Sequence, residues 1–107
     1  MTYGEIVQFA LTLPEVEESL CYQRPAVKRG KRAMFALKED GENLSLKLDW
    51  DNHDRLLKEH PEFYFKTPHY EGWPWFLVRF EKMSKADLRE LVRLSWEDAP
   101  FPARRRK

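Results

Sequence analysis

The chain has 107 residues, a length typical of one domain with one hydrophobic core. Charged residues make up 35% of it with both signs interspersed, and the formal net charge is only +1. The single cysteine, Cys21, excludes a disulfide framework, and the first residues lack the basic and apolar regions of a signal peptide. No apolar run approaches the length that spans a bilayer, so we expect a cytoplasmic protein without a membrane partner.

The first residues have the spacing of a short amphipathic helix. Ile6 and Ala10 recur at helical intervals, and Thr2 with Glu5 matches a capping box. Pro14 ends the helix, because proline disfavours the helical conformation in the residue before it. We therefore expect a helix at the start of the chain.

Extended segments follow this helix. Residues 19–29 predict a strand that Pro25 interrupts and that resumes beyond it. Residues 31–38 and 43–49 alternate between apolar and polar side chains, and Asp40-Gly41 lies between them. This combination indicates a β-hairpin, because Asp-Gly favours a tight turn.

The second half of the chain mixes helical and extended patterns. In order, it predicts a helix opening at Asp51, a strand at 63–66, a loop at 67–74, a strand at 75–81 and a helix capped by Ser84. Such an order is typical of an α+β fold with an antiparallel sheet and helices packed on one face. We expect residues 1–103 to form a single domain and the basic tail 104–107 to be disordered.

Nothing in the sequence predicts catalytic machinery, a cofactor or a metal site. His53, His60 and His69 lack the cysteine partners of a structural zinc site, and we expect them to be solvated. Cys21 is expected to be a small core thiol. The chain contains neither a phosphate-binding glycine loop nor a nucleophile elbow, so we expect no enzyme.

Two segments are unusual. Residues 28–32 place four positive charges on a predicted turn, where they would either contact phosphates or only aid solubility. Residues 66–79 are rich in aromatic side chains, which would either stack on a ligand or cover the end of the core. We expect Phe76 to pack inward and leave the role of Trp73 open.

Short motifs along nearly the whole chain, in the same order, resemble the MmcQ/YjbR family. Residues 22–28 are similar to the family's Y-G-x-P-A-F-K stretch, although Gln23 stands where the family often has glycine. The other matching motifs are Leu13-Pro14-Glu15-Val16-Glu17-Glu18, Gly30-Lys31, Phe35-Ala36-Leu37, Leu46-Lys47, Thr67-Pro68-His69-Tyr70, Gly72, Trp75, Val78 and Ser95-Trp96.

The resemblance implies a CyaY-like α+β fold with a double-wing motif and DNA binding. It transfers no catalytic residue. The residue-by-residue match to the family's motifs is strongest at six positions, which are Lys28, Lys31, Lys47, His69, Gly72 and Trp75.

Two hypotheses for function follow. The first is a DNA-binding protein, monomeric by expectation, that contacts phosphates through the basic hairpin and the sheet. Its contacts would come from Lys28, Arg29, Lys31, Arg32, Lys47, Lys66, His69, Trp73 and Arg79. The second is a small-molecule or protein-interaction module that uses the aromatic loop His69–Trp75, and the low net charge favours it. Convergence of the basic residues on one face would favour nucleic acid.

Overall fold

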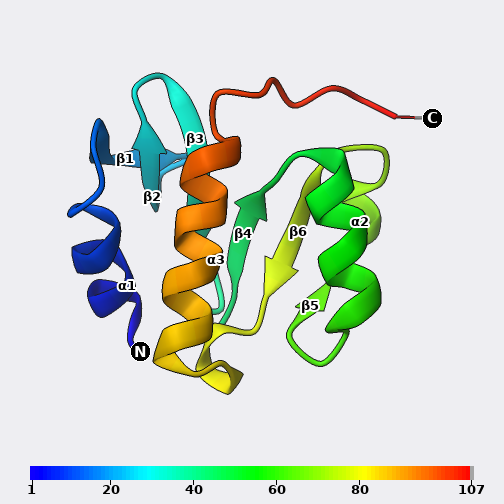
Figure 1. Cartoon of the computed structure of the whole chain (residues 1–107), viewed down its shortest axis with the longest axis horizontal. Helices are drawn as coiled ribbons and strands as arrows, with labels where there is room; N and C mark the ends of the chain where they lie inside the picture. Colours follow the sequence, from blue (N-terminus) through cyan, green and yellow to red (C-terminus); the bar gives the residue numbers. More distant parts are fainter. Residues whose placement is uncertain (107) are drawn as a thin grey trace.

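Six strands form one antiparallel sheet in the computed structural model, which describes residues 1–106 (Figure 1). In chain order they are β1 (Val16–Cys21), β2 (Arg24–Arg29), β3 (Arg32–Leu37), β4 (Leu44–Lys47), β5 (Tyr64–Phe65) and β6 (Trp75–Val78). Their order in the sheet is β1-β2-β3-β4-β6-β5, and every neighbouring pair is antiparallel.

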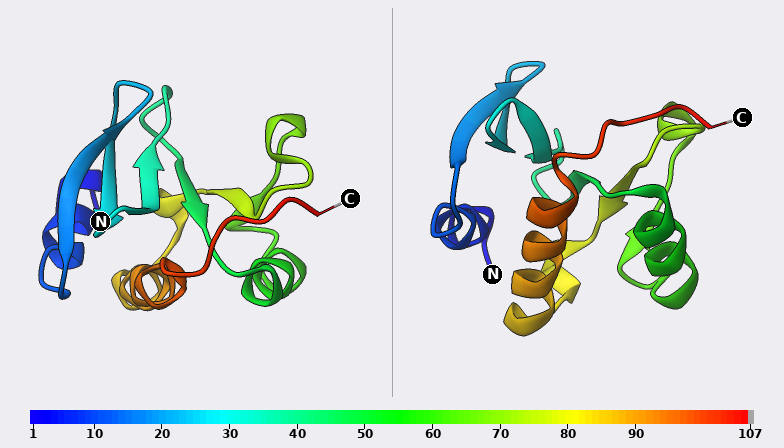
Figure 2. Two further views of the ribbon diagram at one scale, coloured as in Figure 1. Left: turned by 90° about the horizontal axis from the view of Figure 1, so that it is seen from above. Right: turned by 45° about the horizontal axis from the view of Figure 1, so that its top comes forward.

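Three helices lie on one face of this sheet, which leaves the other face open (Figure 2, left). They are α1 (Tyr3–Ala10), α2 (Trp50–Glu59) and α3 (Lys85–Asp98), and two short 3₁₀ helices, η1 (Pro68–Tyr70) and η2 (Phe80–Lys82), flank β6. The predicted α+β class with an antiparallel sheet and one-sided helices is therefore confirmed. Within residues 1–106, no helix has the length and apolar character needed to cross a membrane.

The alternation of side chains along the strands explains the two faces. Phe35, Leu46 and Phe76 are register partners on β3, β4 and β6, and all three are buried in the core beneath the helices. The next register pair, Ala36 and Ser45, faces the opposite side, since successive side chains of a strand alternate. The open face thus has small side chains at its centre.

Two helix starts agree with the expectation. The Thr2 hydroxyl accepts a hydrogen bond from the Glu5 amide (3.2 Å), and the Glu5 carboxylate accepts one from the Thr2 amide (2.9 Å). The Ser84 hydroxyl accepts from the Asp87 amide (3.1 Å) at the start of α3. Both caps satisfy backbone donors that the helix itself leaves free.

The extended segment predicted across residues 19–29 is instead a tight hairpin of β1 and β2. Tyr22 and Gln23 form its turn, with φ values of 50° and 66°. Both residues occupy the left-handed region that hairpin turns of this kind need. Glycine and asparagine normally signal such a turn, and neither is present at these two positions. The sequence pattern of residues 19–29 therefore predicted one interrupted strand instead of a hairpin.

Two further expectations were wrong. The last strand ends at Val78 and not at residue 81, because residues 80–82 form η2. The tail 104–107 was expected to be disordered, but residues 104–106 contact the fold, where the Arg106 amide donates to the Gly72 carbonyl (2.7 Å). Residue 107 lies outside the described residues. The tail leaves α3 and runs toward α2 (Figure 1).

The strained turn generates a stability prediction. Replacing Gln23 by glycine should raise the free energy of unfolding by about 0.5–1 kcal/mol, because glycine adopts a positive φ without the side-chain clash. The same replacement at Gln8, an exposed position within α1, should lower it by about 0.5–1 kcal/mol. Urea unfolding of both variants measures this, and a destabilised Gln23→Gly variant would contradict the strain argument.

Candidate functional site

A groove lies on the open face of the sheet. It encloses about 870 Å³, and Ala36 and Ser45 contribute to its floor. We call it the open-face groove, and its aromatic lining residues are Tyr22, Tyr70, Trp73 and Trp75. Tyr22 is 96% exposed and Trp73 40% exposed, so large aromatic surfaces face solvent here.

A few polar groups accompany these aromatic walls. The Lys38 ammonium donates to the Tyr70 hydroxyl (3.1 Å) and lies 5.4 Å from the centre of its ring. Arg24 pairs with Glu39 across the rim (3.4 Å). Lys38 has no carboxylate within ion-pair distance among residues 1–106, so it is a cation available to a ligand.

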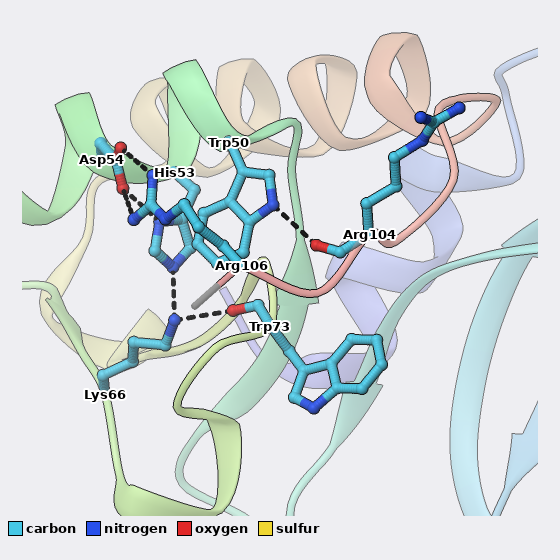
Figure 3. A network of polar contacts seen from close by, with 7 residues as sticks. All are labelled: Trp50, His53, Asp54, Lys66, Trp73, Arg104 and Arg106. Atoms are coloured by element: carbon cyan, nitrogen blue, oxygen red, sulfur yellow. Dashed lines mark hydrogen bonds and ion pairs between the residues drawn. The ribbon is translucent and has the colours of Figure 1, made fainter.

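The backbone carbonyl of Trp73 is bound by a polar network that includes a buried histidine (Figure 3). The Lys66 ammonium donates to the Trp73 carbonyl (2.6 Å) and lies 2.9 Å from Nε2 of His53. His53 Nδ1 lies 2.9 Å from the Asp54 carboxylate. The network therefore connects α2 with the loop before β6.

His53 was expected to be solvated, but it is only 2% exposed. Its ring is packed edge-on against Trp50 and Phe76, at centroid distances of 4.7 and 5.7 Å. A lysine on one ring nitrogen and a carboxylate on the other favour the neutral ring with its proton on Nδ1. The spacing of histidines in the sequence could not predict this burial, because the partners of His53 lie on α2, on β6 and in the loop after β5.

The network shifts the ionisation of its members. Burial lowers the pKa of His53, and the Lys66 charge acts in the same direction. Burial also lowers the pKa of Lys66. The hydrogen bonds from Arg106, with a further one from His53, lower the pKa of Asp54 to about 2. At neutral pH the network thus combines a neutral imidazole with an ionised carboxylate.

The tail completes this network on its outer side. The Arg106 guanidinium donates to both Asp54 oxygens, at 2.7 and 3.0 Å, and lies 3.8 Å from the centre of the Trp50 ring. The Trp50 indole N–H donates to the Arg104 carbonyl (2.7 Å) (Figure 3). The last described residues therefore lie across α2 and the loop around Gly72.

Lys47, one of the predicted phosphate contacts, is buried and only 4% exposed. Its ammonium donates to the carbonyls of Ala99 (3.0 Å) and Phe101 (2.7 Å), just beyond α3. Cations favour this end of a helix, where carbonyl groups lack partners within the helix. Lys47 therefore has a structural role, and its ammonium is not accessible to a phosphate group.

The predicted hairpin tip is present, since Gly30 and Lys31 join β2 to β3. The charges of the tip are divided, however. Lys28 pairs with Glu17 (3.1 Å), while Arg29 lies 4.0 Å from the centre of the Trp96 ring and donates to the Trp96 carbonyl (2.9 Å).

Lys31 and Arg32 remain exposed at the tip. Arg79 stacks on Phe65, with 4.1 Å from its guanidinium carbon to the ring centre, and its guanidinium also donates to the Pro61 carbonyl. The structure therefore does not bring the nine predicted contacts onto one surface. The groove is lined by residues at the Tyr22 end of the β2–β3 hairpin, opposite the basic tip.

His69 and Trp73 are brought together, since both line the open-face groove. Cys21 also lines it and is partly exposed, so the expectation of a core thiol was wrong. Phe76 packs inward as expected. Among residues 1–106, no cluster of three or more His, Cys, Asp or Glu side chains is placed to hold a metal ion.

Comparison with known proteins gives one family. The YjbR family model matches residues 11–98 of the chain. The chain is also 42% identical over 41 residues to "Uncharacterized protein Rv2570" of Mycobacterium tuberculosis (strain ATCC 25618 / H37Rv) and to "Uncharacterized protein Mb2600" of Mycobacterium bovis. These matches span 38% of this chain and 32% of the length of each relative.

The buried histidine makes stability depend on pH. Unfolded His53 takes up a proton as the pH falls through about 6.5, whereas the folded residue stays neutral until a lower pH. The unfolded state then binds more protons, so the free energy of unfolding should fall as the pH drops from about 7.5 to about 5.5. Urea unfolding across this range measures the slope.

Replacing His53 by glutamine should flatten that slope. Replacing the exposed His69 by glutamine is the matched control for the exchange of a histidine for glutamine. An unaltered slope in the His53→Gln variant would show that another group causes the pH dependence.

Proposed function

We propose that this chain, which belongs to the YjbR family, binds a small molecule with a planar ring in the open-face groove. The observation that carries the proposal is the combination of a floor of small side chains with exposed aromatic walls. Ala36 and Ser45 leave room above the sheet, and Tyr70, Trp73 and Trp75 border that space. Ligand sites in proteins are typically concave, mostly apolar and equipped with a few orienting polar groups.

The dimensions of the groove agree with such a ligand. Its volume of about 870 Å³ lies within the range of roughly 300–1,000 Å³ that small-molecule sites occupy. Aromatic side chains prefer stacked or edge-on contact with other rings. A planar ring would therefore find contact surfaces on several sides of the groove.

The charges at the groove narrow the ligand class further. Arg24 and Glu39 neutralise each other, while Lys38 offers its charge beside the Tyr70 hydroxyl. An ammonium and a hydroxyl together suit a carboxylate or phosphate oxygen. We therefore favour an aromatic compound that carries one acidic group.

A thermal-shift panel of aromatic carboxylates and mononucleotides tests this proposal. We expect at least one compound to raise the melting temperature, because a ligand that binds only the folded state stabilises it. Trp73→Ala and Lys38→Met should each abolish the shift. Phe101→Ala, which removes an exposed aromatic outside the groove, should preserve it.

Two outcomes would contradict the proposal. One is a panel in which no compound at millimolar concentration shifts the melting temperature. The other is a shift that survives in both the Trp73→Ala and the Lys38→Met variants.

A second candidate function, DNA binding, is favoured by one observation. Lys31 and Arg32 are exposed at the hairpin tip, which lies beside the end of α3, since the neighbouring Arg29 donates to the Trp96 carbonyl. Phosphate contacts need only such a local group of cations. The nucleic acid would lie along this edge of the molecule and not across the open face.

Fluorescence anisotropy with labelled single-stranded and duplex DNA tests this candidate. Affinity should fall steeply with added salt, because phosphate contacts release counterions. Replacing Lys31 and Arg32 by alanine should weaken binding about tenfold or more at low salt. The control replaces the exposed helix residues Lys58 and Lys85 and carries the same loss of charge.

If both double variants lose the same DNA affinity, the protein attracts DNA only through its net charge and the hairpin tip is not a binding site. Absence of binding at low salt would exclude the candidate.

A further inference from the structure

The surface formed by Trp50, Asp54 and the loop at Gly72 holds an arginine in a manner typical of peptide recognition. Arg106 meets it through a bidentate pair with Asp54 and through stacking on Trp50 at 3.8 Å. Arginine forms both contacts at once because its guanidinium is planar and forked. Lysine offers neither the fork nor the flat face.

The backbone of the tail is held at two points, Arg104 and Arg106 itself. The Trp50 indole N–H donates to the Arg104 carbonyl (2.7 Å) (Figure 3). The Gly72 carbonyl accepts a hydrogen bond from the Arg106 amide (2.7 Å). Gly72 has a φ of 84°, and a Cβ there would lie 3.0 Å from the Arg106 carbonyl oxygen. A glycine at this position therefore permits the close approach of an extended peptide.

The receiving surface is held in place by groups that do not belong to the tail. His53 contacts the Asp54 carboxylate from within the fold, and its ring packs against Trp50. Lys66 fixes the loop that carries Gly72 through the Trp73 carbonyl. Such internal support keeps the geometry of a site when its occupant leaves.

The tail itself is suited to exchange. Arg104, Arg105 and Arg106 are all exposed, so none of these side chains is buried in the core. The Arg106–Asp54 pair is half-exposed on both sides, so water can solvate both groups when the pair opens. Release of residues 104–106 thus leaves the core and the contacts of Lys47 intact.

We propose that Trp50, Asp54 and Gly72 form a binding site for an arginine-bearing peptide segment, and that the chain's own Arg106 fills this site in cis. A partner peptide that presents an arginine in an extended backbone displaces the tail and makes the same contacts in trans. The site is separate from the open-face groove, so either proposal stands if the other fails.

The test uses the full chain with Arg106 replaced by alanine and a synthetic peptide with the sequence of residues 99–106. Loss of Arg106 empties the guanidinium position without touching the core. The readout is the NMR resonance of the Trp50 indole N–H, assigned with a Trp50→Phe variant. Added peptide should return this resonance toward its position in the unmodified protein.

Three comparisons make the result specific. The unmodified protein should bind the peptide at least about tenfold more weakly than the Arg106→Ala variant, because its own Arg106 competes at high effective concentration. An Arg105→Ala variant loses the same charge as Arg106→Ala but keeps Arg106, so it should bind as weakly as the unmodified protein. A peptide with lysine in place of Arg106 should bind about tenfold more weakly. Adding Asp54→Asn to the Arg106→Ala variant should weaken binding to a similar extent.

Several results would overturn the proposal. If the peptide leaves the Trp50 indole resonance of the Arg106→Ala variant unmoved, the site does not accept an arginine segment in trans. If the lysine peptide binds equally well, only bulk charge is recognised. If the unmodified protein binds as tightly as the variant, the peptide occupies another surface.

Discussion

The buried ring of His53 belongs to helix α2 and joins this helix to the loop between β5 and β6 through Nε2, while Nδ1 is fixed within the helix. Nδ1 lies against Asp54 of the helix, and Nε2 lies against Lys66, which in turn donates to the Trp73 carbonyl. A buried imidazole that is satisfied at both nitrogens stabilises one geometry, because breaking either contact leaves a polar group unpaired away from water. The positions of the loop and of the helix surface therefore depend on one side chain.

Both candidate binding surfaces border this loop. On one side the Trp73 ring lines the open-face groove, and on the other side the Gly72 carbonyl accepts a hydrogen bond from Arg106. The groove combines aromatic walls with an available ammonium, whereas the tail site combines a carboxylate with an indole ring. The two surfaces thus suit ligands of opposite charge, and the His53 bridge gives them a common support.

Local chemistry in the sequence was enough to predict most of the fold. The capping box at Thr2, the hairpin around Asp40-Gly41 and the cap at Ser84 depend on neighbouring residues, and all three are present. The turn at Tyr22-Gln23 was missed because it adopts positive φ without glycine or asparagine. For the site, the aromatic loop was singled out correctly as unusual, and His69 and Trp73 do line one groove. The burial of Lys47 and His53 was not predicted, because burial of a charged or titratable side chain depends on partners distant in the chain.

The tautomeric state of His53 decides whether this ring bridges α2 and the loop. Long-range ¹H–¹⁵N NMR correlations distinguish a protonated from an unprotonated ring nitrogen at neutral pH. The bridge predicts a neutral ring with the proton on Nδ1, donated to Asp54, and an unprotonated Nε2 that accepts from Lys66. A proton on Nε2, or a doubly protonated ring, would show that Nε2 does not accept from Lys66 and that His53 does not support the loop.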